Sequence, residues 1–206
     1  MKVAVLTTGR AGSMSLYKAC QHIRNFSAGH DSKEGALAAE RTRIADDHIE
    51  IDTRFAWLLG QLHEQNGDQI HYVFLTREVG AIAASYNRRW TNRKGIVRGY
   101  CEAILQRDKP ESDIAIALDL VETAEANIRT FLSGRRHSVI RLEMWEDDLK
   151  RFFADIGADA DIDKANAAFS QRHNASRQGS LLVRSRFKLS RLVDGLERRL
   201  KQMRSR

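Results

Sequence analysis

Short apolar runs alternate with longer amphipathic segments along most of the chain. Runs with the length and composition of β-strands cover residues 3–6, 26–30, 49–52, 71–76 and 138–142. Helical periodicity or polarity predicts helices over residues 14–25, 31–44, 55–66, 79–86, 95–106, 113–132 and 143–153. Strands that alternate with helices in this way pair in parallel. The pattern therefore predicts an α/β fold, a single domain with a mostly parallel central sheet flanked by helices.

Composition narrows the class of protein. The chain has 206 residues, 42% of them hydrophobic and 30% charged, which fits one soluble globular domain that we place at residues 1–183. No apolar stretch has the length of a membrane span, and the first residues have the pattern of a core strand instead of a signal peptide. Cys20 and Cys101 are too few and too far apart for a disulfide framework or a zinc site. These features predict a cytoplasmic protein with reduced thiols.

The net charge of +7 is concentrated at the end of the chain. Residues 184–206 contain nine Lys or Arg and two acidic residues, so residues 1–183 are balanced in charge. A balanced domain disfavours nucleic-acid binding. The apolar residues of this tail recur at nearly helical spacing, which predicts a basic amphipathic C-terminal helix. We expect this helix to dock on the same domain, and contact with an anionic membrane surface is the alternative.

The segment between the first strand and the first helix has the composition of an anion-binding loop. Residues 7–13 are small and contain Gly9 and Gly12, with Arg10 between them. Such a loop directs several backbone N–H groups into one concavity at the positive end of a helix, where phosphate or sulfate binds. The glycines permit a close approach of the backbone, and the Arg10 guanidinium adds a charge-assisted contact. The Gly-Lys-Ser/Thr ending of nucleotide triphosphatase loops is absent, which disfavours a kinase.

A second candidate for anion binding follows the strand at residues 71–76. Arg77 comes directly after this strand, and Ser85 lies on the predicted helix that follows. Ligands of doubly wound folds bind at the carboxyl edge of the sheet. An arginine there can bind phosphate oxygens with two nitrogens, and a serine two turns into the next helix can reach the same group.

Together, the runs TTGRAGSMSL and VFLTREVGAIAASYNRRW resemble the two nucleotide-binding signatures of sulfotransferases that use 3′-phosphoadenosine 5′-phosphosulfate (PAPS). Ala11 and Met14 depart from the first signature, and a Glu-Val pair replaces the Asp-Pro of the second. The resemblance implies a P-loop-like fold and a PAPS-dependent transfer of a sulfuryl group to an acceptor hydroxyl. It also implies that Arg77 and Ser85 bind the 3′-phosphate. The residues implied to bind the 5′-phosphosulfate are Thr8, Gly9, Arg10, Ala11, Gly12, Ser13, Met14 and Ser15.

Sulfuryl transfer also needs a base for the acceptor proton and positive groups for the charge on the transferred oxygens. Arg10 and the loop N–H groups can supply the positive groups. Tyrosylprotein and small bacterial sulfotransferases carry an acidic residue just after the second strand, and this position falls on residues 29–31 here. His30 suits the role of base, because imidazole side chains have an ordinary pKa of about 6.5 and are largely neutral in the cytoplasm. Asp31 and Glu34 are the alternatives.

The remaining residues leave the acceptor and two rival functions open. The other histidines are scattered without metal-ligand spacing, so no metal site is predicted. Asn174 and Arg177 are further candidates, where the family has a loop that closes over the nucleotide. The predicted acceptor is a small molecule or glycan, with a carbohydrate or lipid hydroxyl as examples. The rivals are a P-loop kinase acting on a small molecule, and a non-catalytic module that binds an anion or a membrane.

Overall fold

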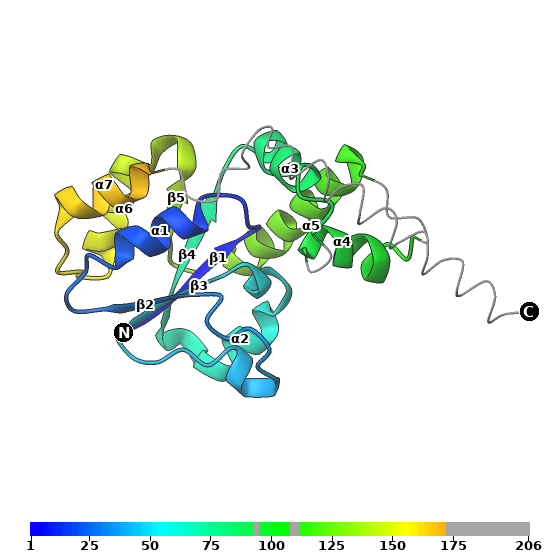
Figure 1. Cartoon of the computed structure of the whole chain (residues 1–206). Helices are drawn as coiled ribbons and strands as arrows, with labels where there is room; N and C mark the ends of the chain where they lie inside the picture. Colours follow the sequence, from blue (N-terminus) through cyan, green and yellow to red (C-terminus); the bar gives the residue numbers. More distant parts are fainter. Residues whose placement is uncertain (93–94, 108–111, 172–206) are drawn as a thin grey trace, which may run out of the picture.

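Five parallel strands form the centre of the molecule. The computed structural model describes residues 1–92, 95–107 and 112–171, and the predicted tail helix and the candidates Asn174 and Arg177 lie outside these residues. The sheet has the order β2-β3-β1-β4-β5, and every pairing in it is parallel (Figure 1). Its strands are β1 (Lys2–Thr7), β2 (Ser27–His30), β3 (His48–Asp52), β4 (Ile70–Thr76) and β5 (His137–Arg141). The prediction of an α/β domain with a parallel central sheet is confirmed.

Helices cover both faces of the sheet. Helices α1, α6 and α7 lie together on one face, whereas α2 and α5 lie on the other, and α3 and α4 pack against α5 (Figure 1). Their bounds are α1 (Ser13–Cys20), α2 (Leu59–Asn66), α3 (Val79–Asn87), α4 (Ile96–Gly99), α5 (Ile114–Leu132), α6 (Trp145–Asp155) and α7 (Ile162–Ser170). Shorter helical segments are η1 (Ala38–Arg41), η2 (Thr53–Trp57), η3 (Gly67–Gln69), the π-helix η4 (Tyr100–Ile104) and η5 (Leu142–Met144).

Strand β1 shows how the sequence pattern builds the two layers. Val3 and Val5 pack into the apolar cluster under α1, α6 and α7, whereas Ala4 and Leu6 pack into the cluster under α2 and α5. All four side chains are fully buried. Successive side chains of a strand point to opposite faces, so a strand covered on both sides is a continuous apolar run. Because β1 is the middle strand, the loop that follows it emerges at the centre of the sheet's carboxyl edge.

Two predicted helices differ from the observed ones, and one observed helix was not predicted. The polar helix predicted over residues 31–44 is wrong, and only the short η1 forms there. Asp31, Gly35 and Ala38 have φ values of 51°, 80° and 48°, a left-handed conformation that interrupts a right-handed helix. Helix α1 ends at Cys20 instead of residues 24–25, and α7 was not predicted.

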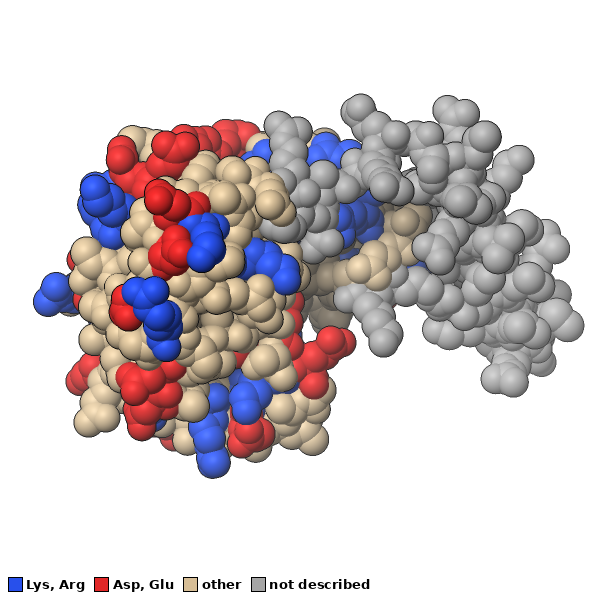
Figure 2. Space-filling view, turned by 60° about the vertical axis from the view of Figure 1, so that its left-hand side comes forward, with Lys and Arg blue, Asp and Glu red and all other residues tan. Residues whose placement is uncertain are grey.

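Charges on the described surface are mixed. Acidic and basic side chains are interspersed over the face that Figure 2 shows. This distribution agrees with the balanced composition of residues 1–183. None of the helices in the described part of the chain is long and apolar enough to span a bilayer.

A buried carboxylate joins the two strands at one edge of the sheet. Glu50 on β3 is 2% exposed and accepts hydrogen bonds from the N–H and hydroxyl groups of Ser32 at 3.0 and 2.6 Å. Its Oε2 atom is also 3.1 Å from His48 Nε2. A Cβ atom on Gly29 would lie 2.3 Å from this Oε2, so the glycine of β2 makes room for the carboxylate. Burial favours protonation of Glu50, but the bonds from His48 and Ser32 outweigh it and lower the pKa of the carboxyl.

We expect Glu50→Gln to lower the free energy of unfolding by roughly 2–4 kcal/mol at pH 7, because it removes a buried, hydrogen-bonded charge. A carboxyl whose folded pKa lies below its usual 4.5 stabilises the fold above that pH and loses this effect as pH falls through the folded pKa. The difference between wild type and variant should therefore shrink in acid. Urea unfolding at pH 7 and at lower pH values measures it, with exposed Glu64→Gln as the control. A pH-independent difference would contradict this account.

Candidate functional site

The loop between β1 and α1 adopts an anion-binding conformation. Gly9, Arg10 and Gly12 have φ values of 77°, 60° and 97°, so three of four consecutive residues are left-handed. Gly12 is the N-cap of α1, and no side chain caps this helix. Within residues 1–92, 95–107 and 112–171, no hydrogen bond of the loop uses the N–H groups of Ala11, Gly12, Ser13 and Met14. These donors lie at the positive end of a helix dipole, which is the geometry that binds phosphate and sulfate.

Both glycines of the loop have left-handed φ values and also lie close to side chains of other segments. A Cβ atom on Gly9 would lie 2.3 Å from Tyr86 Oη, and one on Gly12 would lie 2.8 Å from Leu142 Cδ1. The Tyr86 hydroxyl donates a hydrogen bond to the Thr8 carbonyl, and burial raises the pKa of Tyr86, so the phenol stays neutral. Helix α3 and the segment after β5 thus fix the shape of the loop. Tyr86 is not among the site residues predicted from the sequence, and its position directly after Ser85 was the available signal.

Arg10 connects the loop to the second candidate region. Its Nε atom donates a hydrogen bond of 3.0 Å to Ser85 Oγ on α3. Arg77, directly after β4, donates from a terminal nitrogen to the Arg10 carbonyl at 3.5 Å. The structure therefore brings Arg10, Arg77 and Ser85 together at the carboxyl edge of the sheet.

The electrostatics of this cluster favour an anion. Burial lowers the pKa of the Arg10 guanidinium, and the positive charges of Arg89, Arg77 and Arg88 lower it further. Arginine nevertheless stays protonated near neutral pH. Of these three arginines, Arg88 is exposed and has the smallest effect. A phosphate group bound next to Arg10 and Arg77 would offset the repulsion between these two and accept their N–H donors.

His30, at the end of β2, faces the start of α1. Its Nε2 atom is 3.0 Å from Ser13 Oγ, and its Nδ1 atom is 3.4 Å from Asp31 Oδ2. The ring also contacts the ring of Tyr17, with 5.9 Å between the centroids. The imidazole is mostly buried, with 15% of the side chain exposed. A group that can accept a proton therefore lies beside the first residue of α1.

The other residues implicated by the sequence are placed as follows. The Thr8 hydroxyl donates to the Gly9 carbonyl, which makes it part of the loop's own bonding. Ser15 donates to the carbonyl of Gln171 after α7. Glu34 is exposed. Cys20 is fully buried, and burial raises the pKa of its thiol.

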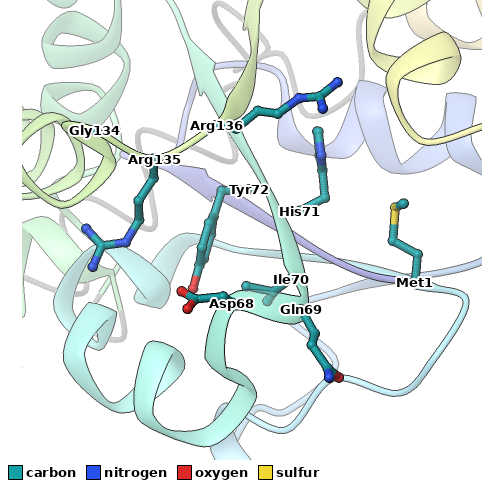
Figure 3. Close-up of a pocket in the computed structure, with 9 residues that line it drawn as sticks. All are labelled: Met1, Asp68, Gln69, Ile70, His71, Tyr72, Gly134, Arg135 and Arg136. Carbon is teal, nitrogen blue, oxygen red and sulfur yellow. The ribbon is translucent and has the colours of Figure 1, made fainter.

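A cavity of about 400 Å³ lies at the opposite, amino edge of the sheet (Figure 3). It is lined by Met1, Asp68, Gln69, Ile70, His71, Tyr72, Gly134, Arg135 and Arg136. These residues come from the starts of β1, β4 and β5 and the segments before them. The glycine-containing loop and the arginine cluster are at the other edge, where parallel sheets bind ligands, so we place the candidate site there. Among the described residues, no three His, Cys, Asp or Glu side chains are grouped to hold a metal ion.

Comparisons with known proteins agree with the fold. No family model matches the chain, and no curated protein is similar enough in sequence to count as a relative. The structure is similar to the crystal structure of mouse sulfotransferase SULT7A1 complexed with PAP, with a TM-score of 0.56 and 13% sequence identity. The similarity covers 87% of this chain and 69% of that chain. At this identity the similarity shows a shared fold, which is the P-loop-like sulfotransferase fold that the two sequence signatures implied.

Proposed function

We propose that the protein is a PAPS-dependent sulfotransferase. The observation that carries this proposal is the 3.0 Å contact between Arg10 and Ser85. It joins the two sequence regions that resemble the 5′-phosphosulfate and 3′-phosphate signatures, although 75 residues separate them. A nucleotide with phosphate groups on the 5′ and 3′ positions of its ribose needs two neighbouring anion sites. The fold shared with a PAP-bound sulfotransferase supports the same assignment.

Each part of the site has a distinct role in this proposal. The loop N–H groups of residues 11–14 bind the 5′-phosphosulfate, and Arg77 and Ser85 bind the 3′-phosphate. Arg10 lies between the two groups, because its backbone belongs to the loop and its side chain contacts Ser85. The sequence suggested that Arg10 stabilises charge on the transferred group. We propose that Arg10 also contacts the 3′-phosphate.

His30 is the proposed base. PAPS supplies the sulfuryl group and carries PAP as the leaving group. An acceptor hydroxyl forms the new S–O bond while the bond from sulfur to the 5′-phosphate breaks, and His30 Nε2 takes the hydroxyl proton. The hydroxyl of Ser13, 3.0 Å from Nε2, marks a position from which a proton can reach the imidazole. The proposed acceptor is a hydroxyl of a small molecule or glycan, and the proposed location is the cytoplasm.

Binding of three nucleotides by calorimetry tests the proposal. We expect adenosine 3′,5′-bisphosphate (PAP) to bind at least about tenfold more tightly than adenosine 5′-phosphate, because only PAP occupies both anion sites. ATP with Mg²⁺ should bind more weakly than PAP, since no lysine follows Gly12.

The other outcomes identify the rival functions. Preference for ATP with Mg²⁺ would favour the P-loop kinase. Equal binding of PAP, adenosine 5′-phosphate and inorganic sulfate would favour a non-catalytic anion-binding module. A screen of carbohydrate, lipid and phenolic acceptors with ³⁵S-labelled PAPS then tests transfer itself, and PAP release with water as acceptor gives a background rate.

A further inference from the structure

We propose that Asp31 is a positioning residue that holds His30 in the tautomer with the proton on Nδ1. The inference rests on the proposed function, because it concerns the residue that we assign as the base. It also replaces the earlier alternative that Asp31 is itself the base. Four features of the described residues carry it: the two contacts of the imidazole, the anchoring of Asp31, the charges around its carboxylate, and the groups that its two carboxylate oxygens face.

The two nitrogens of the His30 ring face different groups. Nδ1 is 3.4 Å from the carboxylate oxygen Oδ2 of Asp31, and Nε2 is 3.0 Å from the hydroxyl oxygen of Ser13. A neutral imidazole has one N–H group and one lone pair. A carboxylate only accepts hydrogen bonds, whereas a serine hydroxyl can also donate. The contact between Nδ1 and Oδ2 is electrostatic instead of a hydrogen bond, and the negative carboxylate favours the tautomer with the proton on Nδ1 and the lone pair on Nε2, towards Ser13.

Asp31 is held at two further points, one on its backbone and one on its carboxylate. Its backbone N–H donates to the Ile51 carbonyl at 3.0 Å, so Asp31 continues the pairing of β2 with β3. Its second carboxylate oxygen, Oδ1, accepts a hydrogen bond of 3.3 Å from the N–H group of Thr53 in η2. Thr53 in turn lies against the loop, since a Cβ atom on Gly9 would be 3.2 Å from Thr53 Cγ2. Asp31 therefore ties the His30 ring to the same framework that positions the loop.

The surrounding charges leave His30 as the natural partner of Asp31. The other charged groups that act on the Asp31 carboxylate are Asp52 on β3 and Arg54 on η2, and these two form an ion pair with each other. The groups of α1 that face the ring, Ser13 and Tyr17, are uncharged. Burial raises the pKa of Asp31, with a further increase from Asp52, and the charge of His30 opposes this rise. A donor at Nδ1 thus stabilises a carboxylate that is otherwise poorly compensated.

The same geometry argues against Asp31 as the base. One of its oxygens accepts from Thr53, and the other faces Nδ1, on the side of the imidazole away from Ser13. The lone pair on His30 Nε2, in contrast, is directed at the first residue of α1. A carboxylate behind the imidazole also stabilises the imidazolium that forms when Nε2 accepts a proton. His30 then accepts the proton, and Asp31 orients the imidazole ring.

Asp31→Asn tests the inference with little change in shape. Asparagine tolerates the φ of 51° at this position, so the variant removes the charge without adding backbone strain. Asp47→Asn is the matched control, because Asp47 also has a φ of 51° but is exposed and pairs with the chain's amino group. Nitrogen-15 NMR of the full chain at about pH 8, with the His30 signals assigned from a His30→Ala sample, reports the tautomer.

We expect the ratio of the Nδ1–H to the Nε2–H form of His30 to fall by about tenfold in Asp31→Asn and to stay unchanged in Asp47→Asn. Turnover of PAPS with the best acceptor from the screen should fall on the order of 10- to 100-fold in Asp31→Asn, with PAP affinity within about threefold of wild type.

Two results would overturn the inference. One is a tautomer ratio of His30 that is the same in Asp31→Asn as in the control Asp47→Asn. The other is a parallel loss of turnover and PAP affinity, which would show that Asp31 supports the loop and does not act through His30. The tautomer ratio is measured without nucleotide. If the wild type failed to bind PAP at all, the proposed function would fail while the ratio still decided the role of Asp31.

Discussion

His30→Ala should lower turnover by about 10²- to 10⁴-fold, the usual contribution of a positioned general base. PAP affinity should stay within about threefold of wild type. The ring contacts Ser13, Asp31 and Tyr17 and neither Arg10 nor Arg77. The loss should therefore be confined to kcat in assays with labelled PAPS. The wild-type rate should rise with pH over the range in which imidazole groups lose a proton, and the variant should lack this rise.

Controls separate loss of the base from loss of structure. His22→Ala removes a histidine just beyond the far end of α1 and should leave the rate unchanged. Added imidazole should restore part of the activity of His30→Ala, since a small base can enter the space left by the side chain. Turnover within a few-fold of wild type would exclude His30 as the base. A matching fall in PAP affinity would instead make His30 part of the anion site.

The loop and the strand ends of the site could be predicted from the sequence because both are local features. A short apolar run followed by Gly9 and Gly12 predicts a strand, a tight loop and a helix within twenty residues, and the structure has them in that order. Arg77 and Ser85 were placed correctly on β4's end and α3 for the same reason. Parallel pairing then brings both segments to one edge of the sheet.

Contacts between distant segments could not be predicted in this way. The sequence gives no indication that the Arg10 side chain reaches Ser85, because this depends on how α3 packs over the loop. The anchoring of Asp31 by Thr53 depends likewise on the pairing of β2 with β3.

The incorrect prediction of a helix over residues 31–44 has a related cause. Its composition is helical, but left-handed residues at Asp31 and Ala38 turn the chain back towards β3. Asparagine and aspartate adopt this conformation more easily than most residues, yet they also cap helices, so Asp31 had two interpretations in the sequence. Tertiary pairing of Asp31 with Ile51 decided between them.

Arg77→Ala should weaken PAP binding by roughly 30- to 140-fold, which corresponds to about 2–3 kcal/mol for a charge-assisted bidentate contact. Binding of adenosine 5′-phosphate should change far less, because that nucleotide lacks the 3′-phosphate. The structural reason is the position of Arg77 directly after β4, with its guanidinium 3.5 Å from the Arg10 carbonyl and next to the Arg10–Ser85 pair. Calorimetry with both nucleotides measures the two losses in one protein preparation.

Two further variants determine what the loss at Arg77 means. Arg77→Lys keeps the charge but not the planar fork of donors, so PAP affinity should fall between wild type and Arg77→Ala. Arg88→Ala removes the same charge from an exposed residue at the end of α3 and should cost a few-fold at most, since solvent screens it. Equal losses for PAP and adenosine 5′-phosphate in Arg77→Ala would show that Arg77 supports the loop through the Arg10 carbonyl. The 3′-phosphate would then have to be bound by Arg10 and Ser85 without it.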